Sequence, residues 1–377
     1  MEVLDSVVIG AGQAGLSASY HLRRRGIDHV VLDADSGAGG AWQHRWDSLT
    51  MADVHGIAAL PDSLPPDQAL DRAPDQRANQ VVPAYFDAYE HAHDLPVVRP
   101  VAVDRVEDER GLLAVHAGER TWRARTLVNA TGTWSHPFVP YYPGADTFDG
   151  LQLHTHDYDG PERLRGRRTV VVGGGASAVQ LLGEIAPVTE TVWVTRRPPV
   201  WRTDDFTPEV GRAAVALVEE RVRRGLPPAS VVSVTGLALR EQEREAEARG
   251  AYARRPMFAS IEPDGLRWAD GSFEPVDVIV WATGFRPAVS HLAPLHLTSP
   301  HGGIQLAGTT AVRDPRVQLV GYGPSASTIG ANRAGRSAAV SVRQWLGSQS
   351  TDAAASRAIS SSRVASPAGS TSSPERT

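Results

Sequence analysis

The chain contains neither cysteine nor lysine. Without cysteine it has no disulfide framework, no redox dithiol, no thiolate metal ligand and no cysteine nucleophile. All 38 basic residues are arginine, so chemistry that needs a lysine Schiff base is also excluded. The function of the protein therefore depends on other side chains or on a bound cofactor.

The sequence also lacks the features of an exported or membrane protein. No basic stretch precedes the apolar residues 3–9, which argues against a signal peptide. No apolar run approaches the roughly 20 residues that span a bilayer. The net charge of -5 argues weakly against nucleic-acid binding, and the 377 residues with 41% hydrophobic content suit two or three domains. We expect a cytoplasmic protein that binds neither membrane nor nucleic acid.

A glycine-rich turn follows the apolar residues 3–9 and precedes residues 13–25. The pattern predicts a buried parallel strand, a tight turn and a helix whose N-terminus faces a pyrophosphate. The first glycine permits the turn, the second lets the backbone approach the phosphates, and the third lets the helix pack on the strand. The candidate cofactor-binding residues of this segment are Gly10, Gly12, Gln13, Ala14 and Gly15.

Asp33 ends the next predicted strand, Val30–Asp33. It lies about 20 positions after Gly12, the spacing at which a carboxylate binds a ribose hydroxyl in dinucleotide-binding folds. The alternatives are a loop acid or a helix cap. The strand–helix–strand context favours the ribose role.

The same pattern returns further along the chain. Thr169–Val172 predicts a strand, and residues 177–185 predict a helix. The strand Thr191–Val194 then ends in Arg196 and Arg197 rather than in an acid. An arginine pair suits the 2′-phosphate of NADP; the alternative is a solvated basic turn. The candidate residues of this copy are Gly173, Gly175, Ala176, Ser177, Ala178, Arg196 and Arg197.

The rest of the chain gives weaker signals. Apolar and polar residues alternate over residues 97–129, which predicts a meander of strands. Residues 205–255 read as a polar, partly helical insertion, and their charge-rich run Arg240–Arg249 as a solvated helix face. The other predicted segments are an excursion at 60–80, a short helix Tyr85–His93, strand cores at Val101–Val103, Leu112–Val115 and Leu127–Val128, a linker at 133–162, strands Val276–Trp281 and Val317–Val320, a helix at 328–346 and a disordered tail at 348–377.

Each glycine turn has a partner strand that ends in Ala-Thr-Gly, at residues 130–132 and 282–284. This arrangement resembles the flavoproteins with two dinucleotide-binding domains, in which an NAD(P)H domain interrupts an FAD domain. The resemblance implies a glutathione-reductase-like α/β fold with two Rossmann-like domains. The FAD domain would be formed by residues 1–150 and 286–347, and the NAD(P)H domain by residues 163–285. It adds the following candidate cofactor-binding residues: Gly40, Ala41, Trp42, Val101, Ala130, Thr131, Gly132, Ala282, Thr283, Gly284 and Gly321.

A narrower resemblance starts at Phe148, where the sequence fits Phe-x-Gly-x-x-x-His-x-x-x-Tyr. This pattern, placed just before the second glycine turn, is the fingerprint of the flavin-containing monooxygenases. The related Baeyer–Villiger enzymes usually carry Trp where this chain has Tyr158, so the match favours heteroatom hydroxylation. The family often places Asn followed by Pro over the flavin, where this chain has residues 50–56. The candidate catalytic residues are therefore Asp53 or His55, either of which would take the place of that Asn, and the motif histidine, His154.

The resemblance implies that NADPH reduces the flavin and that the reduced flavin traps oxygen as a peroxyflavin. The leading hypothesis is thus an FAD-dependent, NADPH-consuming monooxygenase that acts on a small organic substrate. N- or S-oxygenation is favoured over Baeyer–Villiger oxidation, and the protein is a possible homodimer. His154 can also be a linker histidine bound to backbone. His154, His156 and Asp157 lack a further ligand pattern, so we expect no metal. A flavin reductase for a quinone or redox protein and a nucleotide-binding redox sensor without turnover remain the alternatives.

Overall fold

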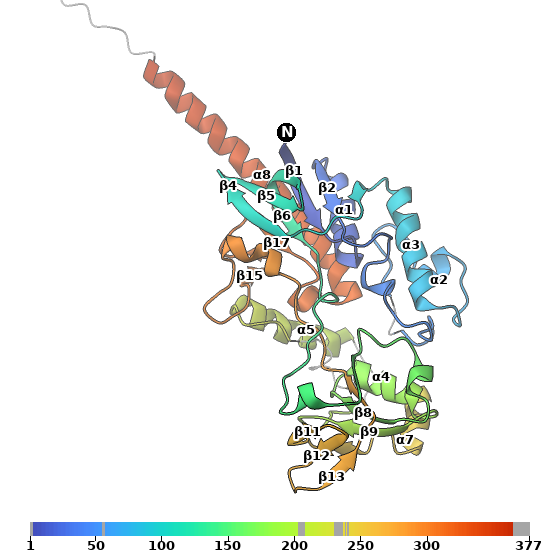
Figure 1. Ribbon diagram of the computed structural model, residues 1–377. Helices are drawn as coiled ribbons and strands as arrows, with labels where there is room; N and C mark the ends of the chain where they lie inside the picture. The colour runs from blue at the N-terminus through green and yellow to red at the C-terminus, as the bar shows by residue number, and fades with distance from the viewer. Residues whose placement is uncertain are drawn as a thin grey trace, which may run out of the picture.

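The computed structural model describes residues 3–54, 57–202, 208–229, 237, 239 and 241–364. These residues form two lobes, each built on its own sheet with parallel central strands (Figure 1). The predicted α/β fold with two dinucleotide-binding units is confirmed.

The larger lobe contains a nine-stranded sheet. Its central strand β1 pairs in parallel with β2 on one side and β6 on the other. Val7 and Val8 of β1 are completely buried, as expected for a strand covered on both faces. The strands are β1 (Val3–Ile9), β2 (His29–Leu32), β3 (Val97–Val98), β4 (Arg105–Glu109), β5 (Leu112–Ala117), β6 (Arg120–Asn129), β15 (Leu306–Ala307), β16 (Thr310–Ala311) and β17 (Val317–Leu319).

Helices α1 and α8 pack closely on this sheet (Figure 1). Their approach depends on Gly335, because a Cβ there would lie 2.6 Å from Ser17 Oγ and 2.7 Å from the backbone nitrogen of Ala18. Such distances are too short for ordinary contacts, so only glycine fits. The helices of this lobe are α1 (Gln13–Arg23), α2 (Pro66–Ala69), α3 (Ala78–Ala92) and α8 (Thr328–Val364).

The smaller lobe contains a five-stranded parallel sheet in the order β10-β9-β8-β14-β7, with a three-stranded antiparallel sheet beside it. Helix α4 (Ala176–Ile185) packs against α7 (Glu241–Ala248). The strands are β7 (Leu151–His154), β8 (Arg168–Val172), β9 (Glu190–Val194), β10 (Arg254–Arg255), β11 (Ser260–Glu262), β12 (Gly265–Arg267), β13 (Phe273–Pro275) and β14 (Val278–Trp281). Five 3₁₀ helices complete the description: η1 (Gly40–Trp42), η2 (Ala145–Thr147), η3 (Pro161–Leu164), η4 (Ser290–Leu295) and η5 (Gly323–Ser325).

Two segments pack differently from what the sequence led us to expect. Strand β7, which lies in the predicted linker, is an edge strand of the smaller sheet and pairs with β14. Helix α5 (Pro208–Arg223), which lies in the predicted insertion of the smaller domain, packs instead on the larger lobe. Its Val222 joins the apolar cluster that contains Leu292 and Leu319. The position of a segment in the sequence therefore does not decide which lobe it packs on.

Two other expectations were wrong at the level of local structure. Residues 101–103 are not a strand. They follow Pro100, which lacks an N–H for a ladder, and the backbone N–H of Val101 donates to the Asp33 carbonyl at 2.7 Å. Helix α8 continues to Val364 instead of ending near Leu346, so residues 348–364 are helical and not disordered. Alanine and serine dominate the start of this extension, and alanine has the highest helix propensity.

Candidate functional site

The two glycine turns share one geometry. Gly10 (φ 98°) and Gly173 (φ 152°) both adopt left-handed backbone angles that favour glycine. A Cβ on Gly10 would lie 2.7 Å from the carbonyl oxygen of Ala130, and one on Gly173 would collide with the carbonyl oxygen of Ala282. Each Ala-Thr-Gly segment thus lies directly against the first glycine of its own turn.

Gly12 and Gly175 are the N-caps of helices α1 and α4. Among the described residues, a Cβ on either of them would meet open space. The first N–H groups of both helices therefore face positions that an anion can reach. Gly15 has a different role, because a Cβ there would collide with the carbonyl oxygen of Gly10. The corresponding Ala178 is completely buried.

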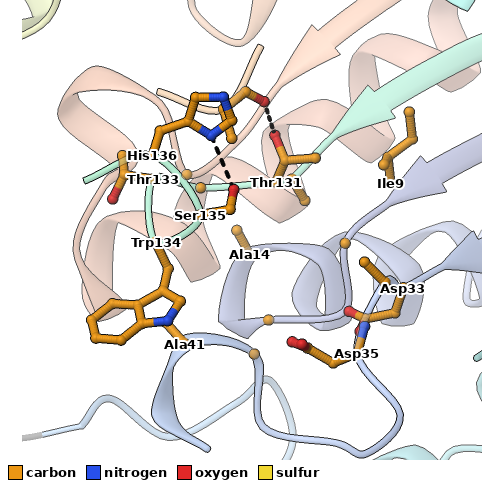
Figure 2. A pocket seen from close by; sticks show the side chains of 18 of the residues that line it. Ile9, Ala14, Asp33, Asp35, Ala41, Thr131, Thr133, Trp134, Ser135 and His136 are labelled. Atoms are coloured by element: carbon orange, nitrogen blue, oxygen red, sulfur yellow. Dashed lines mark hydrogen bonds between the residues drawn. The ribbon is translucent and has the colours of Figure 1, made fainter. Parts of the chain in front are cut away.

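A cavity of about 760 Å³ opens in the larger lobe beside the first turn (Figure 2). This volume is within the range of about 300–1,000 Å³ typical of small-molecule and cofactor sites. Most of the sequence-based candidates of this lobe lie in its wall: Gly10, Gly12, Gln13, Ala14, Asp33, Gly40, Ala41, Trp42, Val101, Ala130, Thr131, Gly132 and Gly321. Gln13 also donates to Ala58 O at 3.0 Å and to Asn332 Oδ1 at 2.9 Å, which ties the helix start to α8.

Asp33 lies at one end of the cavity and is 5% exposed (Figure 2). Its carboxylate accepts hydrogen bonds from the backbone N–H of Ala11 and, at 3.0 Å, from that of Asp35. Burial raises the pKa of Asp33, while the N–H of Ala11 and the charge of Arg99 oppose the rise. Arg99 Nε is 3.7 Å from Asp33 Oδ1, and Arg99 also forms a bidentate ion pair with Glu90 at 2.6 Å. Sequence reasoning missed Arg99 and Glu90, which no local pattern connects to Asp33.

An aromatic group forms the other end of the cavity. Trp134 stacks on Phe285 with ring centroids 5.1 Å apart and contacts His156 at 4.9 Å. All three line the cavity, as does His44, which stacks on Trp134 at 6.2 Å. Sequence reasoning missed this group. The available signal was position, since Trp134 and Phe285 each follow an Ala-Thr-Gly segment.

Two segments connect the lobes, one after Gly132 and one after Gly284, and they run antiparallel beside this aromatic group. We call this pair of segments the crossing. The N–H of Ala288 donates to Gly132 O at 2.9 Å, and the N–H of Phe138 donates to Gly284 O at 2.9 Å. His154 is held against the same crossing, with Nε2 3.0 Å from Gly284 O and Nδ1 accepting from the N–H of His156 at 3.0 Å. These bonds select the tautomer protonated at Nε2, and burial lowers the pKa of His154. Its contacts are those of a positioning residue.

Of the other two catalytic candidates, Asp53 is described, and it does not belong to the cavity wall. Asp53 Oδ2 accepts a hydrogen bond from Thr50 Oγ1 at 2.6 Å, which closes a local turn. His55 lies outside the described residues.

The candidates of the smaller lobe lie apart from the cavity, around the second turn. Arg196 and Arg197 are exposed at the end of β9. The preceding Thr195 is 1% exposed and is held by Arg254, whose Nε donates to Thr195 Oγ1 at 2.8 Å and whose Nη2 donates to Thr195 O at 2.9 Å. The loop is thus fixed while its two arginine side chains remain accessible to solvent.

Glu107, Glu109 and His116 are the group of possible metal ligands in the described part of the chain. Arg105 contacts Glu107 at 3.3 Å, and Arg123 contacts Glu109 at 2.7 Å. Since arginines neutralise both carboxylates, we assign no metal to this group.

A family model described as pyridine nucleotide-disulphide oxidoreductase matches residues 7–226, more than half of the chain. The chain belongs to this family. A flavin-containing monooxygenase from Stenotrophomonas maltophilia is 38% identical, with a TM-score of 0.78 over 92% of this chain and 100% of that one. The chain is therefore a flavin monooxygenase-type oxidoreductase, and its lack of cysteine separates it from family members that reduce disulphides through a dithiol.

Two curated relatives differ in the reactions that their names record. The indole-3-pyruvate monooxygenase YUCCA1 of Oryza sativa subsp. japonica is 28% identical over 76% of this chain and 78% of its own length. A Baeyer-Villiger monooxygenase of Streptomyces coelicolor is 31% identical over 69% of this chain and 51% of its own length. These relatives support an enzyme that acts on small molecules, and they leave the type of oxygenation open. Among the described helices, none is both long enough and apolar enough to cross a membrane.

Proposed function

We propose that this protein is an FAD-dependent, NADPH-consuming monooxygenase that oxygenates a nitrogen or sulfur atom of a small organic substrate. The observation that carries the proposal is the cavity beside the Gly10–Gly15 turn, which ends at the aromatic group on the crossing between the lobes. FAD bound there would supply the redox chemistry. The protein would bind it, orient it and exclude water.

The residues of the cavity fit FAD. A Cβ on Gly12 would meet nothing within 4 Å among the described residues, and the α1 N-terminus beyond Gly12 suits a pyrophosphate. The buried Asp33 carboxylate can accept a ribose hydroxyl bond. Arg99 would keep this carboxylate in its charged form, because a nearby cation opposes the rise in pKa that burial causes.

The second turn would hold NADPH, with its pyrophosphate at the start of α4. The exposed Arg196 and Arg197 would pair with the 2′-phosphate, and Arg254 would hold their loop through Thr195. His154 would keep the crossing at Gly284 in one position, so that the nicotinamide approaches the flavin in one orientation. None of these roles needs proton transfer by His154.

N- or S-oxygenation is supported by the Phe148-to-Tyr158 motif, which ends in Tyr. Tyr158 is 4% exposed and packs edge-on against Trp46 with centroids 5.6 Å apart. The names of the relatives include ketone-directed enzymes as well, so the experiment must separate the two outcomes.

The test is a reaction of the purified holoenzyme with NADPH, ¹⁸O₂ and a panel of amines, sulfides and ketones, followed by mass spectrometry of the products. We expect one ¹⁸O atom in an N-oxide, hydroxylamine or sulfoxide. An ester or lactone would instead assign Baeyer–Villiger oxidation. Fast NADPH oxidation with a quinone but no labelled product would assign the reductase, and a bound flavin that NADPH does not bleach would assign the redox sensor.

A further inference from the structure

Arg45 lies in the cavity wall between two indole rings. Its guanidinium carbon is 4.5 Å from the ring centroid of Trp134 and 5.5 Å from that of Trp42. All three residues line the cavity, and the Asn79 amide donates to the Arg45 carbonyl at 2.9 Å, which fixes the loop. The cation is thus held in place by aromatic faces.

The described residues supply no anion to this guanidinium. Arg45 Nε is buried and has no hydrogen-bond partner among them. Asp35, which also lines the cavity, pairs with His44 at 3.0 Å, and Asp47, two residues further along the chain, pairs with Arg77 at 2.9 Å. Burial alone lowers the pKa of Arg45 to about 10. Because a buried charge is costly unless it is paired, the partner of Arg45 is expected in the cavity.

The position of Arg45 separates its partner from the nucleotide groups already assigned. The α1 N-terminus serves the pyrophosphate, and Asp33 serves the ribose. Figure 2 shows Trp134 on the side of the cavity away from Asp33, and Arg45 lies against Trp134. The anion therefore belongs at the end where the cavity meets His156 and Phe285 of the crossing.

We propose that Arg45 binds an oxyanion of a molecule held at the Trp134 end of the cavity. The first candidate is the carboxylate of a small aromatic acid. The planar guanidinium presents a fork that matches a carboxylate. The walls of Trp42 and Trp134 suit an aromatic body attached to it. A nucleotide phosphate has the same oxyanion chemistry and is the second possible source. The inference rests on the proposed function, in that FAD occupies the remainder of the cavity.

The experiment compares phenylacetate with its neutral isostere phenylacetamide as probes of the oxidised holoenzyme. Binding is read from the perturbation of the flavin absorbance, and the dissociation constants of FAD and NADP⁺ are measured in parallel. We expect the wild type to bind phenylacetate more tightly than phenylacetamide. Arg45→Gln should weaken phenylacetate by about 10-fold or more, the loss of a charge-assisted hydrogen bond, and Arg45→Lys should weaken it less.

The control is Arg120→Gln, which removes an exposed arginine that lies 5.3 Å from the Trp122 ring and should change no dissociation constant. If Arg45→Gln weakens FAD or NADP⁺ instead, the oxyanion is a nucleotide phosphate and the recognition by Arg45 stands. The proposal is overturned if all ligands bind the variants unchanged, if acid and amide are affected equally, or if the wild type prefers neither probe and the nucleotides are unaffected.

The preference of the wild type for the acid needs no variant, so the test survives a substitution that prevents folding. Flavin content and bleaching by NADPH report separately on the proposed function. If flavin content and bleaching are normal but substitution of Arg45 changes no dissociation constant, this inference alone is overturned and the proposed function stands.

Discussion

The hydroxyl of Thr131 donates to the carbonyl oxygen of Ala288 at 2.6 Å, across the crossing between the lobes. Thr283, the middle residue of the second Ala-Thr-Gly segment, donates in the opposite direction to the carbonyl oxygen of Phe138. Each threonine therefore bonds the connecting segment that follows the other lobe's Ala-Thr-Gly. The repeated Ala-Thr-Gly thus has two structural roles. The alanine carbonyl packs on a glycine turn, and the threonine hydroxyl joins the two connections.

Replacing Thr131 with Val should remove this bond while keeping the shape of the side chain. We expect a loss of about 1 kcal/mol in the free energy of unfolding, measured by urea denaturation, and slower bleaching of the flavin by NADPH because the lobes are less well fixed. Thr147→Val is the control, since within the described part of the chain Thr147 bonds only inside its own turn, to Gly144 O. Equal bleaching rates in both variants would contradict the role in positioning.

Removing both Arg196 and Arg197 by substitution with Ala should raise the KM for NADPH by about 10-fold or more. The KM for NADH should change little, because NADH lacks the 2′-phosphate. Arg163→Ala, which removes another arginine of the smaller lobe, serves as the control. Similar changes for both nucleotides would remove the assignment of the phosphate.

Asp33→Asn should weaken FAD binding by about 10-fold, because the amide is nearly isosteric with the carboxylate but a poorer acceptor for the ribose. The dissociation constant is measured by reconstitution of the apoprotein. Arg99→Gln should have a smaller effect in the same direction, since Arg99 acts on FAD only through Asp33. An unchanged flavin affinity in Asp33→Asn would show that the ribose is bound elsewhere.

We expect the free energy of unfolding to fall in acid because of His291. Its Nε2 lies 2.7 Å from Asn129 Oδ1, and burial, with a smaller contribution from His136, lowers the pKa of His291 from 6.5 to about 4. Because the unfolded chain binds the proton more readily, the neutral histidine contributes fully above pH 6.5, and this stability is lost as the pH falls towards 4. The loss between about pH 7 and about pH 4.5 should be roughly 2 kcal/mol.

Urea denaturation of His291→Gln should show a flatter pH dependence than that of the wild type. His91→Gln is the control, because the His91 side chain is 78% exposed. If the stability of His291→Gln depended on pH as steeply as that of the wild type, His291 would not be the source of the acid sensitivity.

Gly335→Ala should destabilise the protein by about 1–3 kcal/mol, because the added Cβ would press on the backbone of α1. Gly347→Ala lies in the same helix, and its added Cβ would meet nothing within 4 Å among the described residues, so it should be neutral or should stabilise by up to about 1 kcal/mol. Thermal denaturation of the two variants compares them directly. Equal effects would mean that α1 and α8 can separate without cost.

The sequence predicted what depends on local pattern. The glycine turns, their Ala-Thr-Gly partners and the strands on either side are local patterns whose backbone angles and spacing leave few alternatives. Asp33 belongs to the same group, because its distance from Gly12 along the chain reflects one strand–helix–strand unit.

Residues that act through contacts distant in sequence could not be predicted in this way. Arg99 reaches Asp33 only because β3 lies beside β2, and Trp134 meets Phe285 only because the two connections run antiparallel. Helix α5 carries an amphipathic pattern that shows it needs an apolar partner, but nothing in its residues identifies the larger lobe as that partner.

The packing of α5 has a consequence for any attempt to separate the two lobes. Gly323 of the larger lobe leaves room for Val222, and Ser299 Oγ donates to Gly225 O at 2.6 Å. Excising residues 151–285 to obtain a minimal flavin-binding fragment would remove this helix and expose the apolar surface beneath it. A viable fragment must keep or replace α5, so the unit that folds is larger than the unit that the strand order defines.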